Sequence, residues 1–519
     1  MKNSRSWLLA GAAGLLLAAV MMLLGRPAGF SAGTLLLSLA AVLGLYAAWR
    51  WAGAERALGW MMAAAFVLRL AAGLGLAMAL PVHGYDVEPS RAGYLFPDAY
   101  ERDTLAWELA SSGQPVWKAF GDEMRVDQYG GLLALSAAVY RYLSPDLHRP
   151  ALIILLAAAV SALGLAFFWK ALVPGPGEPS GWSREAALFG GWLYALYPEN
   201  VLLGGAQMRE PFILGLSAAA FWAVRAWPES RRPAVISLIA GLAGLAVISS
   251  RVAVIVVAVL LLWFWLEHGR VPQTAARRAL LVGAGVVFAA GLTYYGAGWL
   301  SEAAGWDAVL TERSSGWVQL IVDTVGDRFR VPVVTLIGLT QPMLPGALIE
   351  PAAPLARWLS ILRGAGWYFL IPLLLYAPFA ALTARPEDRR AALGLAAINL
   401  VWVVVASYRA GGDMWDNPRY RTHLMVWTAL LAGWAWSQAR ARRSAWLVRW
   451  YGVIGIFLVV TLRWYLSRYT AWKSSLSLIE FLALTAGLSA LLLAGGWGWD
   501  RRRSRTGLRR GSRSPARPE

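Results

Sequence analysis

Long apolar runs recur along this chain, and they constrain its fold more than any other feature. A helix of about 20 apolar residues can cross a bilayer core of roughly 30 Å. We place about 14 such spans, at 7–24, 30–49, 58–80, 150–172, 186–203, 210–226, 233–250, 252–267, 279–299, 366–383, 391–408, 422–438, 447–466 and 478–497. With 58% apolar and 15% charged residues among 519, the pattern predicts an all-α polytopic membrane protein.

The composition argues against several kinds of chemistry. The sequence has no cysteine and four histidines, none of which forms an HExxH pair, so a zinc site built on thiolates or histidines is not expected. No GxxxxGK[ST] or Rossmann-type glycine motif indicates a soluble nucleotide site. The net charge of +18 reflects basic loops and a basic tail, a pattern that orients membrane proteins. We therefore expect contact with membrane lipid and none with nucleic acid.

The placement of lysine and arginine predicts the orientation. With the N-terminus inside, every inner loop is basic and the C-terminus is also inside. Two long segments, 81–149 and 300–365, then face outward. Between Pro81 and Gln128 there are nine acidic and four basic residues, so this outer segment is acidic. We expect a bacterial-type cytoplasmic (inner) membrane as the location, with both termini cytoplasmic.

The chain divides into four parts on this view. Residues 1–57 form two extra N-terminal spans, 58–440 the functional core, 441–497 the last spans, and 498–519 a disordered basic cytoplasmic tail. Within the core, Gln128–Leu143 is apolar but short, and we interpret it as a helix lying in the outer interface. Trp306–Arg330 is expected to form a second surface helix.

The first outer segment carries the candidate that organises our functional hypothesis. Phe96–Gly113 has a helical pattern, in which Pro97 and Asp98 form a start and Gly113 a stop. Asp98 and Glu101 form an Asp-type capping box, so Asp98 could be only a helix N-cap. Alternatively, it presents a carboxylate to a substrate at the membrane surface.

Charges at the outer ends of spans form three further clusters, and burial there is costly. The first is Arg209-Glu210, which could simply begin a helix. The second is Arg251, which could reach the interface as a snorkelling side chain. The third holds Arg419 and Arg421, which depart from the expected orientation of basic residues. They could pair with Asp413 or Asp416, or they could bind an anionic group such as phosphate.

If these ends converge, carboxylates and guanidinium groups would share one cavity. Such a site suits transfer of a group from a phosphate leaving group to a hydroxyl. A carboxylate removes the proton of the acceptor, and arginines stabilise the charge on the departing phosphate. The donor would be reached from within the membrane.

The order of these motifs resembles the GT-C superfamily of multi-pass glycosyltransferases, in particular the protein O-mannosyltransferase-like and aminoarabinose-transferase-like enzymes. The resemblance covers residues 58–440. It rests on Asp98-Ala-Tyr100, the helix from Tyr129, Tyr197-Pro198, Glu210-Pro211-Phe212, Arg251 and Arg419-Tyr420-Arg421. It implies a GT-C-like fold of about 14 spans with outer juxtamembrane helices.

The resemblance also implies a function. The chain would be an inverting glycosyltransferase that moves a sugar from a polyprenyl-phosphate donor to a hydroxyl of a glycan, lipid or protein acceptor, on the outer face. It assigns Asp98 and Glu210 as catalytic, with Asp98 as the base. Arg251, Arg419, Tyr420 and Arg421 would meet the donor phosphate, and Tyr100, Glu101, Arg209 and His423 the substrates.

Several alternatives stay open at this point. Many members have Asp-Glu where this chain has Asp98-Ala99, so Asp86, Glu88, Glu101 and Asp103 are rivals for the base. No cofactor is certain, although Asp98 and Glu210 could share a divalent cation, magnesium or manganese, through oxygen ligands. Other functions are a polymerase or ligase of lipid-linked glycans, a transporter or flippase of such glycans, and a scaffold without catalysis.

Overall fold

The computed structural model describes residues 2–25, 28–121, 129–173, 183–268, 326–411, 413–472 and 476–511, together with residues 124, 294, 296 and 297. Every secondary-structure element assigned in these residues is a helix. In chain order they are α1 (Lys2–Leu24), α2 (Ala32–Trp51), α3 (Arg56–His83), α4 (Glu88–Arg91), α5 (Pro97–Ser111), the short 3-10 helix η1 (Val116–Phe120), α6 (Gly131–Leu143), α7 (Ala151–Leu172), α8 (Arg184–Leu196), α9 (Pro198–Gly205), α10 (Glu210–Ala226), α11 (Arg231–Ile248), α12 (Ser250–His268), α15 (Asp327–Thr340), α16 (Leu344–Ile349), α17 (Pro354–Leu382), α18 (Pro386–Ala410), α19 (Asp416–Arg421), η3 (Thr422–Leu424), α20 (Met425–Ala441), α21 (Ala445–Tyr469) and α22 (Leu478–Gly511).

Ten of the described helices are long and apolar enough to cross a membrane, namely α1, α2, α3, α7, α11, α12, α17, α18, α21 and α22. The protein is therefore a multi-pass α-helical membrane protein. Helices α10 and α20 coincide with predicted spans, but each has 17 residues and would extend only about 25 Å. The predicted span 279–299 lies almost wholly outside the described residues.

The predicted span 186–203 is not one helix, which corrects the sequence interpretation. It is divided into α8 and α9 at Tyr197-Pro198, because proline lacks the N–H that would continue the α8 ladder. Arg69, in the middle of α3 and fully buried, donates to the freed carbonyls of Tyr194 (3.1 Å) and Ala195 (3.0 Å). The charges of this chain thus do not lie only at the ends of spans: Arg69 is a mid-span charge that holds a broken helix.

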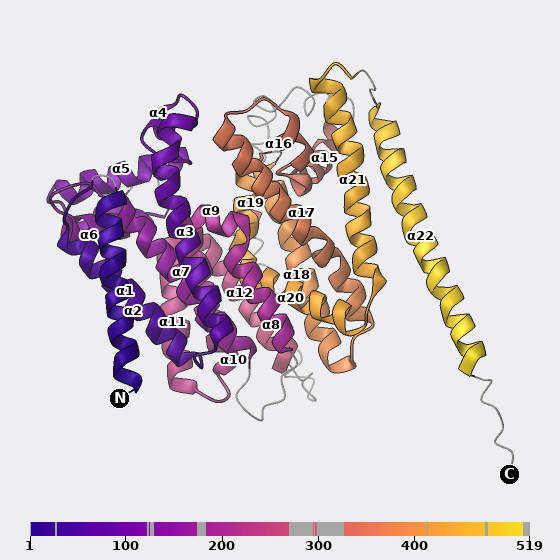
Figure 1. Ribbon diagram of the computed structural model, residues 1–519, viewed down its shortest axis with the longest axis horizontal. Coiled ribbons are helices and arrows are strands. Elements are labelled where there is room, and N and C mark those ends of the chain that lie inside the picture. The colour runs from indigo at the N-terminus through magenta and orange to yellow at the C-terminus, as the bar shows by residue number, and fades with distance from the viewer. Residues whose placement is uncertain are drawn as a thin grey trace, which may run out of the picture.

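Figure 1 shows the start of α1 and the end of α22 at one end of the helices and the segment containing α4 at the opposite end. Helix α7 lies inside the bundle and packs against α2, α3, α8 and α10. A second group comprises α15–α18 and α20, and α22 packs along α21 at the edge (Figure 1). Helices α4 and α16, which belong to the described parts of the two segments expected to face outward, therefore lie at the same end of the molecule (Figure 1).

The α5–α6 segment is fixed by one buried carboxylate. Asp103 accepts hydrogen bonds from the hydroxyls of Tyr94 (2.6 Å) and Tyr140, and its Oδ2 lies 2.8 Å from Nε2 of His148. A side chain at Gly131 would place Cβ 1.9 Å from the carbonyl oxygen of Val247, so glycine lets α6 pack closely on α11. The helix expected in the interface is thus firmly packed.

Two further predicted segments, Trp306–Arg330 and the tail from residue 498, can be compared with the structure only over their described residues. Most of Trp306–Arg330 lies outside the described residues, and α15 begins at Asp327. Helix α22 continues to Gly511, so the segment expected to begin a disordered tail at residue 498 is helical up to that point.

Candidate functional site

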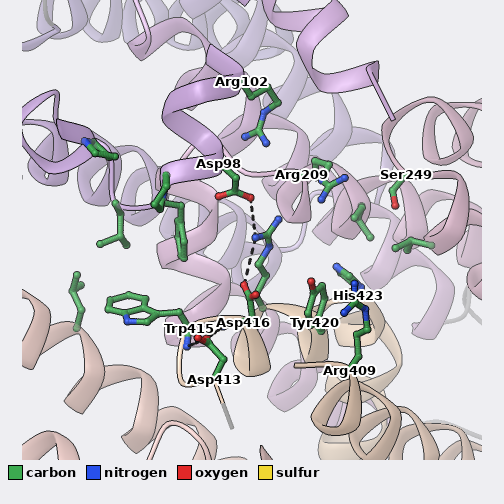
Figure 2. A pocket seen from close by; sticks show the side chains of 18 of the residues that line it. Asp98, Arg102, Arg209, Ser249, Arg409, Asp413, Trp415, Asp416, Tyr420 and His423 are labelled. Carbon is green, nitrogen blue, oxygen red and sulfur yellow. Dashed lines mark hydrogen bonds and ion pairs between the residues drawn. The ribbon is translucent and has the colours of Figure 1, made fainter. Parts of the chain in front are cut away.

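A cavity of about 580 Å³ opens where α3, α5, α10, α12, α17, α18 and α19 meet. We call it the charged cavity. Its lining includes five arginines and three aspartates: Arg102, Arg209, Arg251, Arg409, Arg419, Asp98, Asp413 and Asp416. Ten of its residues, including Asp98 and His423, are labelled in Figure 2. The described residues show that charged side chains from all of these predicted clusters, Asp98, Arg209, Arg251 and Arg419, line one cavity.

Arg419 is the centre of the ion pairs in the charged cavity. Its Nη1 lies 2.9 Å from Oδ2 of Asp98, and its Nε donates to Oε1 of Glu210 at 2.7 Å. Asp416, one turn earlier on α19, lies 3.6 Å from the same Nη1. The side chains of Arg419 and Glu210 are 7% and 4% exposed, and a charge buried this deeply needs such partners. The ion pair with Asp416 that the sequence suggested is therefore the longest of three.

Asp98 occupies the first turn of α5 and is not its N-cap. The N-cap is Phe96, which makes no side-chain capping bond, and Pro97 follows it as the first helical residue. The capping-box interpretation of Asp98 and Glu101 is therefore wrong. Asp98 has a 38% exposed side chain that points from α5 into the charged cavity (Figure 2).

The rival carboxylates of the first outer segment are placed elsewhere. Asp86 pairs with Arg91 on the surface, and Glu88 accepts a hydrogen bond from the hydroxyl of Tyr100 at 3.0 Å. Glu101 is exposed, and Asp103 is buried in its own hydrogen-bond cluster. None of these four lines the charged cavity, whereas Asp98 does.

Glu210 begins α10, with Pro211 in the first turn as the sequence suggested. Its Oε1 faces Arg419, and Nε2 of His423 lies 3.7 Å from that oxygen. Its other oxygen, Oε2, has no hydrogen-bond partner among the described residues. Glu210 therefore holds Arg419 in place through an ion pair but does not itself line the charged cavity.

The proposed sharing of a divalent cation by Asp98 and Glu210 does not fit this geometry. The guanidinium of Arg419 forms an ion pair with each of the two carboxylates and so occupies the space between them. In the part of the chain that the structure describes, no group of three or more histidine, aspartate or glutamate residues could hold a metal ion. We therefore assign no metal to this site.

Asp413 and Asp416 belong to one turn but differ in their surroundings. Oδ1 of Asp413 accepts from the backbone N–H groups of Trp415 and Asp416, both at 2.6 Å, so it holds the turn that leads into α19. Asp416 is half exposed. Burial raises the pKa of Asp416 to about 6, and Asp413, Asp98 and Glu210 add to this effect while Arg419 opposes it.

Arg421 does not reach the charged cavity, contrary to the expectation that it binds donor phosphate there. Its Nη2 donates to the carbonyls of Gly338 (2.7 Å) and Gln341 (2.6 Å), and its guanidinium carbon lies 4.0 Å from the ring centroid of Trp367. Arg421 therefore fastens α19 to α15 and α17.

Of the expected substrate contacts, Arg209 and His423 line the charged cavity, and Tyr100 and Glu101 do not. Arg251 and Tyr420 also line it. In Figure 2, Arg209, Arg409, Tyr420 and His423 lie toward one side, and Asp98, Asp413, Asp416 and Trp415 toward the other. One side is thus rich in hydrogen-bond donors and positive charge, and the other in carboxylates.

The sequence interpretation missed Arg102, Arg409 and the role of Asp416. Arg102 follows Asp98 by four residues, a spacing that places both on one helical face, and it donates to the backbone carbonyl of Gln207. That signal was available. Arg409 ends a predicted span, where an arginine is commonplace, so no local signal distinguished it.

A buried ion pair supports one wall of the charged cavity. Arg363 of α17 makes two bonds to Glu199 of α9, at 2.6 and 3.0 Å, and both side chains are 1% exposed. Arg363 also donates to the backbone carbonyl of Trp415 at 2.9 Å. The indole of Trp415 packs edge-on against Phe96, at 6.0 Å between centroids. The pair thus positions an aromatic lining residue.

Comparison of the chain with protein-family models, with curated protein sequences and with solved structures finds no match.

Proposed function

We propose that the protein is a glycosyltransferase that moves a sugar from a polyprenyl-phosphate donor to an acceptor hydroxyl within the charged cavity. One observation carries the proposal: Asp98, Arg419 and the cationic side chains of Arg209, Arg251 and Arg409 line a single cavity although they are far apart in sequence. The cavity is lined from the end of α3, the starts of α12 and α17 and the end of α18, four helices long and apolar enough to span a membrane. An amphipathic donor can reach such a place from the lipid.

The reaction we propose is a displacement with inversion at the anomeric carbon. The acceptor oxygen attacks that carbon, and the bond from carbon to phosphate oxygen breaks. The bonding electrons leave with polyprenyl phosphate, and Asp98 takes the proton of the acceptor hydroxyl. General bases of this kind contribute about 10²–10⁴ to a rate.

The distribution of charge within the cavity suggests how substrates lie. Arg209, Arg251 and Arg409, with His423, would hold the phosphate, because donors to an anion act most strongly where water is excluded. Asp98 and Asp416 would face the acceptor hydroxyl. This assignment keeps Arg251 with the phosphate. Arg419 becomes the residue that orients Asp98, and Arg421 leaves the site.

The orientation is part of the same proposal. The loops at the end occupied by the chain termini are basic, which favours a cytoplasmic position for that end. The charged cavity would then open at the outer face of a bacterial-type cytoplasmic membrane. Tagging both termini and testing their access to a membrane-impermeant reagent in intact cells would check this orientation.

The experiment for the activity uses the full chain in lipid nanodiscs. Undecaprenyl-phosphate-linked glucose, mannose and aminoarabinose are offered one at a time with an extract of membrane glycolipids as acceptor. Release of undecaprenyl phosphate is followed by mass spectrometry. We expect release with one donor by the unaltered protein and a loss of at least about 100-fold in Asp98→Asn.

Two controls make the result specific. Asp86→Asn changes an exposed carboxylate of the same outer segment, already paired with Arg91, and should leave release unchanged. Equal release by Asp98→Asn and the unaltered protein would remove Asp98 as the base. Absence of release with all donors, together with no binding of undecaprenyl phosphate, would contradict the proposed function.

A further inference from the structure

The turn between α9 and α10 passes through a strained residue just before Arg209, which lines the charged cavity. Gln207 has φ +56°, and among the described residues only Ala54 and Arg443 share a positive φ without being glycine. A side chain in this left-handed region is strained, and such strain persists only where the surrounding contacts hold it. The guanidinium carbon of Arg209 lies 5.0 Å from the ring centroid of Tyr129. The course of the backbone through Gln207 therefore sets where Arg209 lies.

Arg102 of α5 holds this turn by a hydrogen bond to its backbone. Nη2 of Arg102 donates to the carbonyl oxygen of Gln207, and Arg102 is only 3% exposed. Met208, the next residue of the turn, is fully buried in one apolar cluster with Phe96 and Ala99, which lie at the N-terminal end of α5. The turn thus packs against the part of α5 that carries the proposed base.

Two polar connections therefore join α5 to the start of α10. Asp98 is connected to Glu210 through Arg419, at 2.9 and 2.7 Å. Arg102, one helical turn after Asp98, is connected to Gln207 directly. One connection alone would let the two elements rotate about it, whereas two connections at different heights fix both their separation and their angle.

We propose that Arg102 is a positioning residue that, through the carbonyl of Gln207, holds Arg209 at a fixed place relative to Asp98. This inference rests on the proposed function, in which Asp98 takes the acceptor proton and Arg209 holds the phosphate. The acceptor oxygen, the anomeric carbon and the leaving oxygen must lie in line, and a misplacement of about 1 Å can slow such a reaction about 100-fold. Arg102 contributes to this alignment without contacting the reacting atoms.

The expected signature is a loss of kcat without a matching loss of affinity. When the bond from Arg102 is removed, the flexible side chain of Arg209 still reaches a bound phosphate, so the ground state changes little. The alignment with Asp98 matters in the transition state, and an interaction made only there appears in kcat. A residue that binds the phosphate directly and equally in both states would instead raise KM and weaken binding of undecaprenyl phosphate.

The test measures kcat and KM for the donor that the unaltered protein uses, on the full chain in lipid nanodiscs. Arg102→Met keeps the length of the side chain but removes its hydrogen-bond donors. We expect kcat to fall at least about tenfold, and KM and the affinity for undecaprenyl phosphate to change by less than about twofold. The matched control is Arg91→Met, which removes an exposed arginine of the same outer segment, paired with Asp86, and should alter none of these quantities.

Chemical rescue separates positioning from a general structural role. Arg102→Ala leaves room beside the charged cavity, which Arg102 lines, so a free guanidinium ion can enter and donate to the carbonyl of Gln207. We expect millimolar guanidinium to restore part of kcat in Arg102→Ala and none in Arg102→Met, whose side chain fills that room. Arg102→Lys keeps a charged donor and should lose less of kcat than Arg102→Met. The melting temperature of each variant verifies that it is folded.

Three results would overturn the inference. They are an unchanged kcat in Arg102→Met, a loss of affinity for undecaprenyl phosphate as large as the loss of kcat, and a loss of kcat in Arg102→Ala that guanidinium does not restore. The second would make Arg102 a phosphate ligand, and the third would make it a structural residue. If the unaltered protein neither binds undecaprenyl phosphate nor releases it from any donor, the proposed function itself fails and this inference falls with it.

Discussion

Arg419 donates from Nε to Oε1 of Glu210 at 2.7 Å, and both side chains are almost completely buried. The two residues are 209 positions apart in the chain, on α19 and α10. Nη1 of the same guanidinium lies 2.9 Å from Oδ2 of Asp98. The buried cation Arg419 thus links Glu210 to Asp98, the carboxylate that we propose as the general base.

Replacing Glu210 by glutamine should lower the stability of the protein, although Glu210 is not a lining residue of the charged cavity. Arg419 would lose its best-buried counter-ion, and breaking a buried pair from one side costs about 3–5 kcal/mol. The apparent melting temperature in detergent should therefore fall clearly. Glu108→Gln, an exposed change on α5, should leave it unaltered. Equal melting temperatures for both variants would contradict the anchoring role of Glu210.

Asp416 should make stability depend on pH in a defined direction. Its pKa is raised to about 6, so the folded state holds this proton more tightly than the unfolded chain between about pH 4 and 6. The contribution is present at low pH and is lost as the pH rises through 6. We expect Asp416→Asn, which stays neutral, to match the unaltered protein near about pH 3.5, below the unfolded pKa, and to be more stable near about pH 7.5.

The size of this effect should be small. The side chain of Asp416 is 43% exposed, and solvent screening limits such contributions to about 1 kcal/mol or less. Thermal unfolding of both proteins at the two pH values measures the difference. A stability gap that grows as the pH falls would have the wrong sign and would refute the raised pKa.

Replacing Arg421 of α19 and replacing Arg409 near the end of α18 should have different effects. Arg409→Gln removes a lining cation and should weaken binding of undecaprenyl phosphate by about tenfold, since a hydrogen bond to a charged group contributes about 1.5–3 kcal/mol. Arg421→Gln should lower the melting temperature instead, because the carbonyls of Gly338 and Gln341 lose their donor. The reverse assignment of effects would restore Arg421 as a phosphate ligand.

The Glu199–Arg363 pair should respond differently to single and paired replacement. Glu199→Leu alone leaves a buried guanidinium and should cost about 3–5 kcal/mol, whereas Glu199→Leu with Arg363→Met should recover most of that loss. A double-mutant cycle of melting experiments measures the coupling. Additive losses from the two single changes would show that the pair contributes no mutual stabilisation.

Several parts of this account could be predicted from the sequence because they depend on local pattern. Apolar runs of sufficient length predicted helices across the chain, and ten described helices meet the requirements of a span. The outer clusters containing Asp98, Arg209 and Arg419 were recognised because charges beside apolar runs are conspicuous. Local pattern also located the proline that ends α8, although its consequence, a broken helix, was not predicted.

What only the tertiary structure decided is which charges face one another. Arg419 and Arg421 looked equivalent in the sequence, yet residues two apart in a helix point about 200° apart. One therefore enters the charged cavity and the other binds the carbonyls of Gly338 and Gln341. Asp103 was likewise a rival of Asp98 for the role of base in the sequence, and only the packing shows that it is buried against Tyr94 and Tyr140.

The sequence by itself determined that this is a multi-pass helical membrane protein, because hydrophobicity over about 20 residues is a local property of the chain. The tertiary structure alone decided that Asp98, Glu210 and Arg419 meet, since their partners are hundreds of residues away and no periodic pattern encodes such a meeting. The rotation of each short helix about its own axis sets those contacts, and that rotation follows from the packing of the whole bundle.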